Sequence, residues 1–165
     1  MKILIPPSEG KSSKNTTSIK FKDTNSKFID EINHLIIKLS EYKSLELQKI
    51  YGTTNEKAIE LHEQNLNLLE SECSKAIERY TGVVYNNLNP GSLDHKANNF
   101  LKENFLITSA LLGLVSPNDL IPMYKLKMNV LRLHDYWNPL FTDHLSKEDL
   151  IIDLLPEVHR KSSHS

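Results

Sequence analysis

The chain has 165 residues, of which 39% are hydrophobic and 25% are charged, and this composition is typical of one folded domain. Its 20 basic and 21 acidic residues give a net charge of −1, so the overall charge points to no polyanionic partner. A collagen-like chain, a disordered chain and a disulfide scaffold are excluded, because the composition is ordinary and the single cysteine, Cys73, has no second cysteine to pair with.

The sequence does not predict membrane insertion. The longest apolar stretch, residues 105–115, is interrupted by polar residues and falls well short of the roughly 20 residues that a spanning helix needs. Residues 1–5 run directly into Pro6-Pro7 and lack the pattern of a signal peptide. Because one cysteine also suits a reducing compartment, we expect a cytoplasmic protein with no membrane partner.

Charge is unevenly distributed along the chain. Residues 1–22 carry five lysines against Glu9 alone, and residues 120–137 carry three basic residues against Asp135. The stretch between them, residues 23–79, has 7 basic and 11 acidic residues. Such asymmetry can focus an anion on one surface, and it is equally compatible with an ordinary solvated exterior.

The first third of the chain predicts one strand and two helices. Residues 2–5 form a short aliphatic run that predicts a buried strand, and the polar residues 8–25 predict a long loop with a brief strand at 19–21. Apolar residues from 28 to 39 recur at helical spacing, with Thr24 or Asn25 as the candidate cap. A shorter helix is expected over residues 45–50, capped by Ser44.

The remaining pattern alternates between helices and strands. We expect a helix from a cap at Asn55 to residue 80, with one break near Asn65. Residues 82–85 predict a strand because they are rich in β-branched and aromatic side chains, and residues 86–91 predict a turn. The further expected elements are a helix at 94–103, a strand at 105–108, a compact apolar segment at 110–115, a strand at 123–128, a helix at 139–145 and a buried strand at 150–155.

This order of elements predicts a mixed α/β (α+β) fold, with a central mixed sheet, surrounding helices and a helix-hairpin-helix-like helical pair. The helical pair is expected around residues 50–58, where an aliphatic residue is followed by Gly52 and then by Ala58. In a helix-hairpin-helix, the turn and the next helix N-terminus present N–H groups to a DNA phosphate. The alternative is an ordinary capped helical hairpin, because Thr54 stands where a second glycine is usual.

No established catalytic motif is present. Residues 8–11, Ser-Glu-Gly-Lys, follow the first strand and look like a phosphate-binding loop, but a plain surface turn is favoured because the first glycine is missing. His134-Asp135 and Asp143-His144 lack a second histidine at helical spacing, so no metal site is predicted. No cofactor is predicted either.

Several segments, in order, resemble the YaaA-type proteins, also called the peroxide stress or UPF0246 family. The N-terminal MKILIPPSEGK and the YTGVVYNNL of residues 80–88 resemble two blocks of that family. The other matching blocks are residues 50–65, 106–120, 122–128 and 135–137.

This resemblance implies a cytoplasmic, mixed α/β protein that helps cells survive hydrogen peroxide and limits free iron. It also implies DNA binding through a helix-hairpin-helix and a positively charged cleft. Family members usually run longer, with a basic C-terminal portion, so residues 1–165 are expected to be a single YaaA-like domain that is incomplete at its C-terminus. Lys127 also departs from the family, since many relatives have Glu at that position.

Three interpretations follow. The leading one is a non-enzymatic protein that contacts double-stranded DNA and has no obligate protein partner. Its candidate DNA contacts are Lys11, Lys14, Gly52, Thr53, Thr54, Lys57, Lys125 and Arg132. The second is an enzyme or small-molecule binder with a pocket at the loop of residues 8–11, and the third is an incompletely folded chain. The candidate pocket residues are Ser8, Lys11, Tyr124, Lys125, His134 and Trp137, which we expect to cluster around one cleft.

Overall fold

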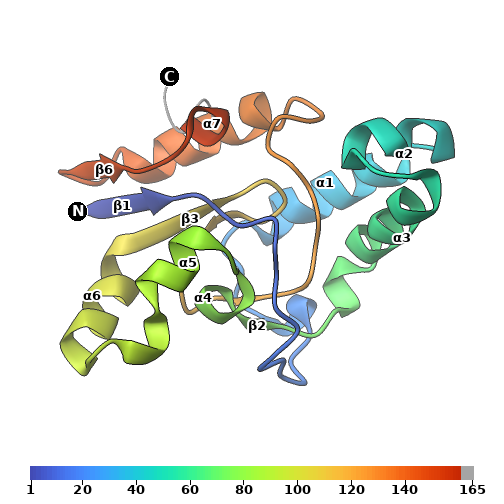
Figure 1. The fold of residues 1–165 in the computed structure, drawn as a ribbon. Helices are drawn as coiled ribbons and strands as arrows, with labels where there is room; N and C mark the ends of the chain where they lie inside the picture. The colour runs from blue at the N-terminus through green and yellow to red at the C-terminus, as the bar shows by residue number, and fades with distance from the viewer. Residues whose placement is uncertain (161–165) are drawn as a thin grey trace.

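The computed structural model describes residues 1–160, and the last five residues of the expected domain lie outside the described part. A four-stranded sheet in the order β4-β3-β1-β6 forms the centre of the molecule (Figure 1). β1 is parallel to both of its neighbours, whereas β4 is antiparallel to β3. The predicted mixed α/β fold with a central mixed sheet is therefore confirmed. The strands are β1 (Lys2–Ile5), β3 (Phe105–Ser109), β4 (Gly113–Val115) and β6 (Ile151–Asp153).

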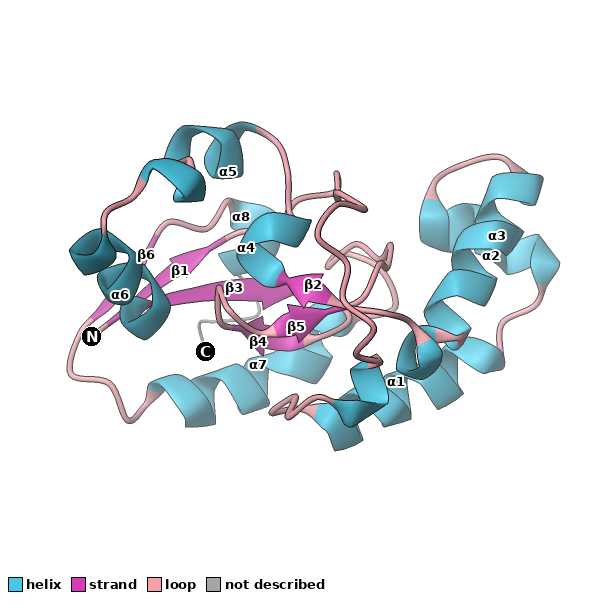
Figure 2. Cartoon of the chain, turned by 90° about the horizontal axis from the view of Figure 1, so that it is seen from below, coloured by secondary structure: helices cyan, strands magenta, loops and turns pink. Residues whose placement is uncertain are grey.

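β1 lies inside the sheet, between β3 and β6. Ile3, Leu4 and Ile5 are all buried, so both faces of the strand are covered. Figure 2 shows helices on either side of the sheet, with α1 and α7 on one side and α5 and α6 on the other. A second, two-stranded sheet pairs β2 with β5 in antiparallel orientation. The bounds are α1 (Ile29–Ser40), α5 (Val83–Leu88), α6 (His95–Asn104), α7 (Leu133–Leu145), β2 (Ser74–Lys75) and β5 (Leu120–Ile121).

The main core lies between the sheet and α7. Trp137 is fully buried there, its Nε1 donates to the Ala110 carbonyl at 2.8 Å, and its ring stacks on Phe141. Gly113 allows this packing: its φ of 77° is left-handed, and a Cβ atom there would lie 2.8 Å from the ring of Phe28.

Two helices form a hairpin to the side of the sheet, α2 (Ser44–Tyr51) and α3 (Asn55–Leu66), visible at the right of Figures 1 and 2. This hairpin has its own apolar cluster of Leu47, Ile50, Tyr51 and Ala58. Side chains from residues 126–131 pack against the cluster, so this stretch joins the hairpin to the body of the molecule.

Residues 82–85 do not form the predicted strand. Gly82 has a φ of 99°, which turns the chain, and α5 begins at the next residue. Val83 and Val84 are exposed, whereas Tyr85 is buried and its hydroxyl donates to the Pro6 carbonyl at 2.8 Å. Tertiary anchoring of Tyr85 therefore overrides the strand propensity of the two valines.

The predicted strand at 123–128 is also wrong, because these residues have no regular secondary structure. The Lys125 N–H donates to the side chain of Asn65 at 3.0 Å, and the Lys125 carbonyl accepts from the same side chain at 2.7 Å. The Asn65 side chain thus pairs with the main-chain groups of Lys125 that a neighbouring strand would otherwise pair with.

Several element boundaries differ from the predicted ones. α3 ends at Leu66, near the predicted break at Asn65, and is followed by β2 and the short α4 (Ala76–Arg79) rather than by more helix. The predicted caps Ser44 and Asn55 are the first residues of their helices, and Thr24 and Asn25 lie before α1. The predicted strand at 19–21 is replaced by a 3-10 turn at Phe21–Asp23, and α7 begins six residues before the predicted 139.

Within residues 1–160, no helix is long and apolar enough to cross a membrane.

The C-terminal helix α8 (Glu157–Arg160) is a single turn that follows β6.

Candidate functional site: a lysine-lined pocket beside the helical hairpin

A pocket of about 250 Å³ lies where the chain leaves β1. Loops at the carboxyl ends of parallel strands are common places for ligand sites, because the ends of neighbouring strands converge there. Three separate stretches of the chain meet in this pocket. Its lining residues are Pro7, Ser8, Glu9 and Lys11, then Tyr124, Lys125, Leu126, Lys127, Met128 and Asn129, and finally Val158 and His159.

Main-chain pairing holds Lys11 at this position. Lys11 forms an isolated antiparallel bridge with Tyr80, and the Thr81 N–H donates to the Gly10 carbonyl at 3.1 Å. A Cβ atom at Gly10 would lie 2.6 Å from Oγ1 of Thr81, so a larger residue there would have to displace the Thr81 side chain. The Lys11 side chain is therefore fixed against the layer of aromatic residues below the loop.

That layer consists of tyrosines joined by their hydroxyl groups. The Tyr80 and Tyr124 hydroxyls are 2.6 Å apart, and the Ser109 hydroxyl donates to Tyr124 at 2.7 Å. Burial raises the pKa of Tyr124 to about 12 and that of Tyr80 well above its usual value. Both tyrosines are thus uncharged at neutral pH and form a floor under the Lys11 amine, and Tyr124 also lines the pocket.

The Lys11 amine lies over this floor. Its Nζ is 4.0 Å from the ring centre of Tyr124 and 5.2 Å from that of Tyr80, and it donates to the Ser8 carbonyl at 3.1 Å. Burial, followed by repulsion from Lys125, lowers the pKa of Lys11 to about 7. A large fraction of Lys11 is therefore a neutral amine at neutral pH.

Two further lysines lie at the pocket mouth, where Glu9 bridges them. Its carboxylate is 2.6 Å from Nζ of Lys125 and 3.5 Å from Nζ of Lys127. The hydrogen bond from Lys125 lowers the pKa of Glu9, which is exposed and stays ionised. Two charged lysines against one exposed carboxylate, with the partly protonated Lys11 behind them, make this pocket attractive to anions.

The α2–α3 turn lies next to the same lysines. Gly52 has a left-handed φ of 63°, and a Cβ atom there would lie 4.0 Å from Nζ of Lys127. Thr54 precedes α3 without capping it through its side chain, which leaves the first N–H groups of the helix for water or a ligand. Lys57, in the first turn, pairs with Glu60 on the exposed surface.

The structure brings together only part of the predicted set. Ser8, Lys11, Tyr124 and Lys125 line the pocket. Trp137 lies in the core, away from the pocket lining, and His134 lines a neighbouring cavity that shares Asn129 and Val158 with the pocket.

The predicted DNA contacts fall into separate groups. Gly52, Thr53, Thr54 and Lys57 belong to the α2–α3 turn and the start of α3, close to Lys127. Lys14 lies on the loop beside β2, and Arg132 precedes α7 and pairs with Asp135.

Among the titratable residues that line the pocket, sequence reasoning missed three as pocket components, Glu9, Lys127 and His159. The basic run of residues 125–127 was a signal for Lys127. No local signal pointed to His159, because it reaches the pocket only where α8 follows β6.

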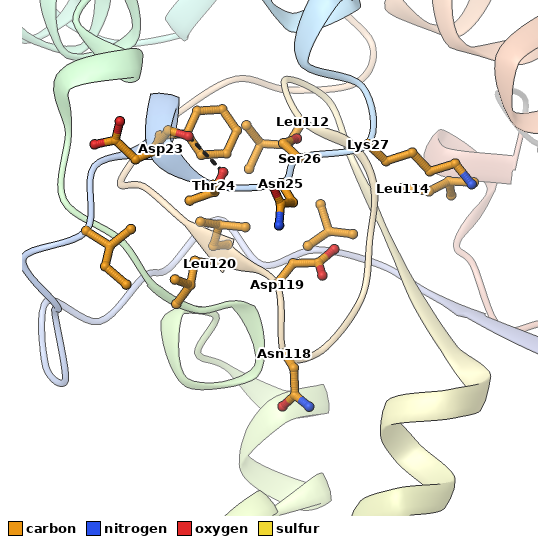
Figure 3. A pocket seen from close by; sticks show the side chains of 14 residues that line it. Asp23, Thr24, Asn25, Ser26, Lys27, Leu112, Leu114, Asn118, Asp119 and Leu120 are labelled. Atoms are coloured by element: carbon orange, nitrogen blue, oxygen red, sulfur yellow. Dashed lines mark hydrogen bonds between the residues drawn. The ribbon is translucent and has the colours of Figure 1, made fainter.

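A second pocket, of about 280 Å³, lies between residues 19–27 and 112–121 (Figure 3). Figure 3 shows Asn25 and Asp119 facing the same space, and burial raises the pKa of Asp119. None of the predicted site residues lines this pocket. Among residues 1–160, no cluster of three or more His, Cys, Asp or Glu side chains could hold a metal ion.

The fold and the site together define a mixed α/β protein with a cationic pocket beside a projecting helical hairpin. The sequence model of the family described as "Peroxide stress protein YaaA" matches residues 1–165, and the chain belongs to this family.

Curated relatives agree with this assignment. A UPF0246 protein of Rickettsia conorii is 32% identical over 124 residues, which cover 73% of this chain and 50% of the relative. A UPF0246 protein of Streptococcus pneumoniae is 29% identical over 164 residues, covering 94% and 65%. An uncharacterized protein of Campylobacter jejuni is 32% identical over 153 residues, covering 89% and 61%. The chain therefore spans about half to two thirds of the length of these relatives.

Proposed function

We propose that this peroxide stress protein acts in the cytoplasm by binding the phosphate backbone of double-stranded DNA at the α2–α3 turn. Peroxide damages DNA through iron chemistry, so DNA binding fits a role in peroxide stress that is linked to limiting free iron. The observation that carries the proposal is the position of Lys127 beside Gly52, at the start of a helix whose first turn has no side-chain cap.

Each part of the turn suits a phosphate. Gly52 has no side chain, so a phosphate can approach the main chain closely. The N-terminal end of α3 carries free N–H groups and the positive end of the helix dipole. Lys127 adds a full positive charge beside the turn.

Competing ion pairs at this surface are weak. Lys57 and Glu60 form an exposed pair, and such pairs contribute little to stability because water screens them. Glu9 is also exposed although it bridges Lys125 and Lys127. A phosphate can therefore replace either carboxylate at small cost.

The test is duplex binding at several salt concentrations for the parent and three variants, Gly52→Asn, Lys57→Glu and Lys127→Glu. Asparagine tolerates a left-handed φ, so Gly52→Asn blocks the approach of the phosphate with little backbone strain. Lys102→Glu on α6 is the matched control, because it makes the same charge change at the opposite end of the molecule (Figures 1 and 2).

We expect each of the three variants to weaken binding to unrelated duplexes alike, because phosphate contacts carry no base sequence information. The slope of log K against log salt should become shallower by about 0.9 for each phosphate that a variant no longer neutralises. Equal affinities for parent and turn variants would rule out the turn, and no parent binding at low salt would remove DNA binding from this chain.

A second candidate function is the binding of a small anionic molecule at the pocket of residues 8–11. The position of the Lys11 amine favours it, because the amine lies over two tyrosine rings and two further lysines line the same pocket. Native mass spectrometry of the purified protein distinguishes the two functions, since a co-purifying small molecule supports the pocket and co-purifying nucleic acid supports the turn.

A further inference from the structure

We propose that Lys11 is a nucleophilic amine that forms a Schiff base with a small anionic aldehyde or ketone bound in the pocket. This inference rests on the second candidate function, the binding of a small anion at the same place. It goes beyond binding because it assigns a reaction to one atom, Nζ of Lys11.

The placement of the amine is the first argument. Lys11 is one of the residues that line the pocket, its Nζ lies over the rings of Tyr124 and Tyr80, and its hydrogen bond goes to a main-chain carbonyl, that of Ser8. The neighbouring carboxylate of Glu9 is drawn instead to Lys125 and Lys127. The surroundings of the amine are therefore aromatic carbon and main chain, in a residue that lines the pocket.

The charges around Lys11 favour its neutral form. Burial contributes most to its low pKa, Lys125 and Arg79 add repulsion, and Glu9 opposes them. A lysine that is desolvated and close to another cation is activated as a nucleophile, because the free amine carries the reactive lone pair. The titratable and charged groups that face Lys11 or line its pocket are Glu9, Arg79, Tyr80, Tyr124, Lys125, Lys127 and His159.

The pocket mouth supplies the anion specificity. Lys125 and Lys127 already hold one anionic group, the exposed carboxylate of Glu9. A carboxylate or phosphate of a ligand can take this position and displace Glu9 toward solvent. The volume of about 250 Å³ lies just below the usual range of ligand pockets, so the pocket favours a small molecule.

The reaction needs no further reactant. The lone pair of Nζ attacks the carbonyl carbon, the electron pair of the C=O π bond moves to the oxygen, and one of the two protons of the nitrogen is transferred to that oxygen. The resulting carbinolamine then loses its hydroxyl group together with the remaining proton of the nitrogen as water, which leaves a C=N bond. One water molecule is released, and nothing is oxidised or reduced.

Pyridoxal 5′-phosphate, an aldehyde with a phosphate group, is the probe for this reaction. The full chain is mixed with less than one equivalent of probe, reduced with borohydride to trap the imine, digested and analysed by peptide mass spectrometry. We expect the adduct mainly on Lys11, with labelling that rises as the pH passes through about 7. Excess inorganic phosphate should protect Lys11 from the probe.

Two variants of the pocket and one control variant sharpen the experiment. Lys11→Arg should abolish the main adduct, whereas Lys102→Arg on the exposed face of α6 should leave it unchanged. Glu9→Gln should increase the labelling of Lys11 several-fold at neutral pH, because it removes both a competing carboxylate and a charge that favours the protonated amine. This variant keeps Lys11 and tests the proposal even if Lys11→Arg fails to fold.

The outcomes separate the reaction from the binding function. Labelling spread over surface lysines with no preference for Lys11 would overturn the Schiff base. If the probe binds, as unreduced complexes in native mass spectrometry show, and phosphate displaces it while Lys11 stays unlabelled, the reaction is refuted and the binding function stands. If neither binding nor labelling is seen, both are refuted.

Discussion

Arg79 shows that a single buried cation organises the N-terminal loop. Nη1 of Arg79 donates to the Ser12 carbonyl at 2.7 Å, and its other nitrogen atoms donate to the carbonyls of Glu72 and Ile121 at 3.4 Å. Arg79 is 1% exposed, so these main-chain acceptors compensate its loss of water. Arg79 thus holds the loop that carries Lys11 at the Ser12 carbonyl, and the Lys11 amine holds it at the Ser8 carbonyl.

The buried amine of Lys11 predicts a pH dependence of stability. Its pKa is about 7 in the folded chain and 10.5 in the absence of burial, so between these values the unfolded chain binds a proton that the folded chain does not. Stability therefore rises with pH in this interval. We expect the free energy of unfolding of the parent to increase from pH 7 to pH 9, and Lys11→Met to flatten this increase.

Urea denaturation at a series of pH values measures this slope. The interval ends near pH 9 because the buried tyrosines and Cys73 have raised pKa values in the folded chain, and their ionisation favours unfolding at higher pH. Lys102→Met, at an exposed position, is the control. A slope that is the same in the parent and in Lys11→Met would contradict the assignment of a buried amine.

At the level of elements, the hairpin of α2 and α3 is attached through Asn65. This side chain is fully buried and bonds both main-chain polar groups of Lys125 as well as the Tyr51 hydroxyl at 3.1 Å. Tyr51 in turn shares a hydrogen bond of 3.1 Å with Nδ1 of His62, whose pKa is lowered by burial. One polar network therefore sets the position of the hairpin relative to the lysines of the pocket.

Asn65→Leu should lower the free energy of unfolding by about 2 to 4 kcal/mol, because the N–H and carbonyl of Lys125 lose their partners in a partly buried place. The same variant should also increase amide hydrogen exchange in α2 and α3. Asn86→Leu on exposed α5 makes the same substitution without burial and serves as the control. Equal stability of the two variants would show that the network does not hold the hairpin.

At the level of the whole molecule, β6 is an edge strand of the sheet with exposed apolar side chains. β6 pairs with β1 and with no other strand among residues 1–160. The alternate side chains of Leu150, Ile152 and Leu154 are 52%, 38% and 58% exposed. An unpaired strand edge with apolar neighbours favours association with other chains or with apolar ligands.

We expect this chain to bind a hydrophobic dye or to self-associate through β6. Ile152→Lys should reduce both the dye fluorescence and the associated fraction in sedimentation measurements. Ile37→Lys on α1 is the control, since Ile37 is 65% exposed and lies away from the sheet margin. A monodisperse monomer with sharp unfolding and no dye binding would contradict the prediction.

Local patterns by themselves determined the elements whose partners lie within a few residues. β1 follows from a continuous apolar run closed by two prolines. α6 follows from Asp94, whose side chain accepts the Ala97 N–H at 2.8 Å as a helix cap. The collinear blocks also determined family membership, since the family match covers the whole chain.

Tertiary structure decided whatever depends on distant partners. Whether residues 82–88 form a strand or a helix rests on the bond from Tyr85 to Pro6, 79 residues away, and the form of residues 123–128 rests on Asn65. The pocket was decided in the same way, because Glu9 meets Lys125 across 116 residues and His159 joins from α8. Sequence patterns report only the neighbours of a residue along the chain, whereas the burial that neutralises Lys11 and the charges that surround it exist only once these segments have packed together.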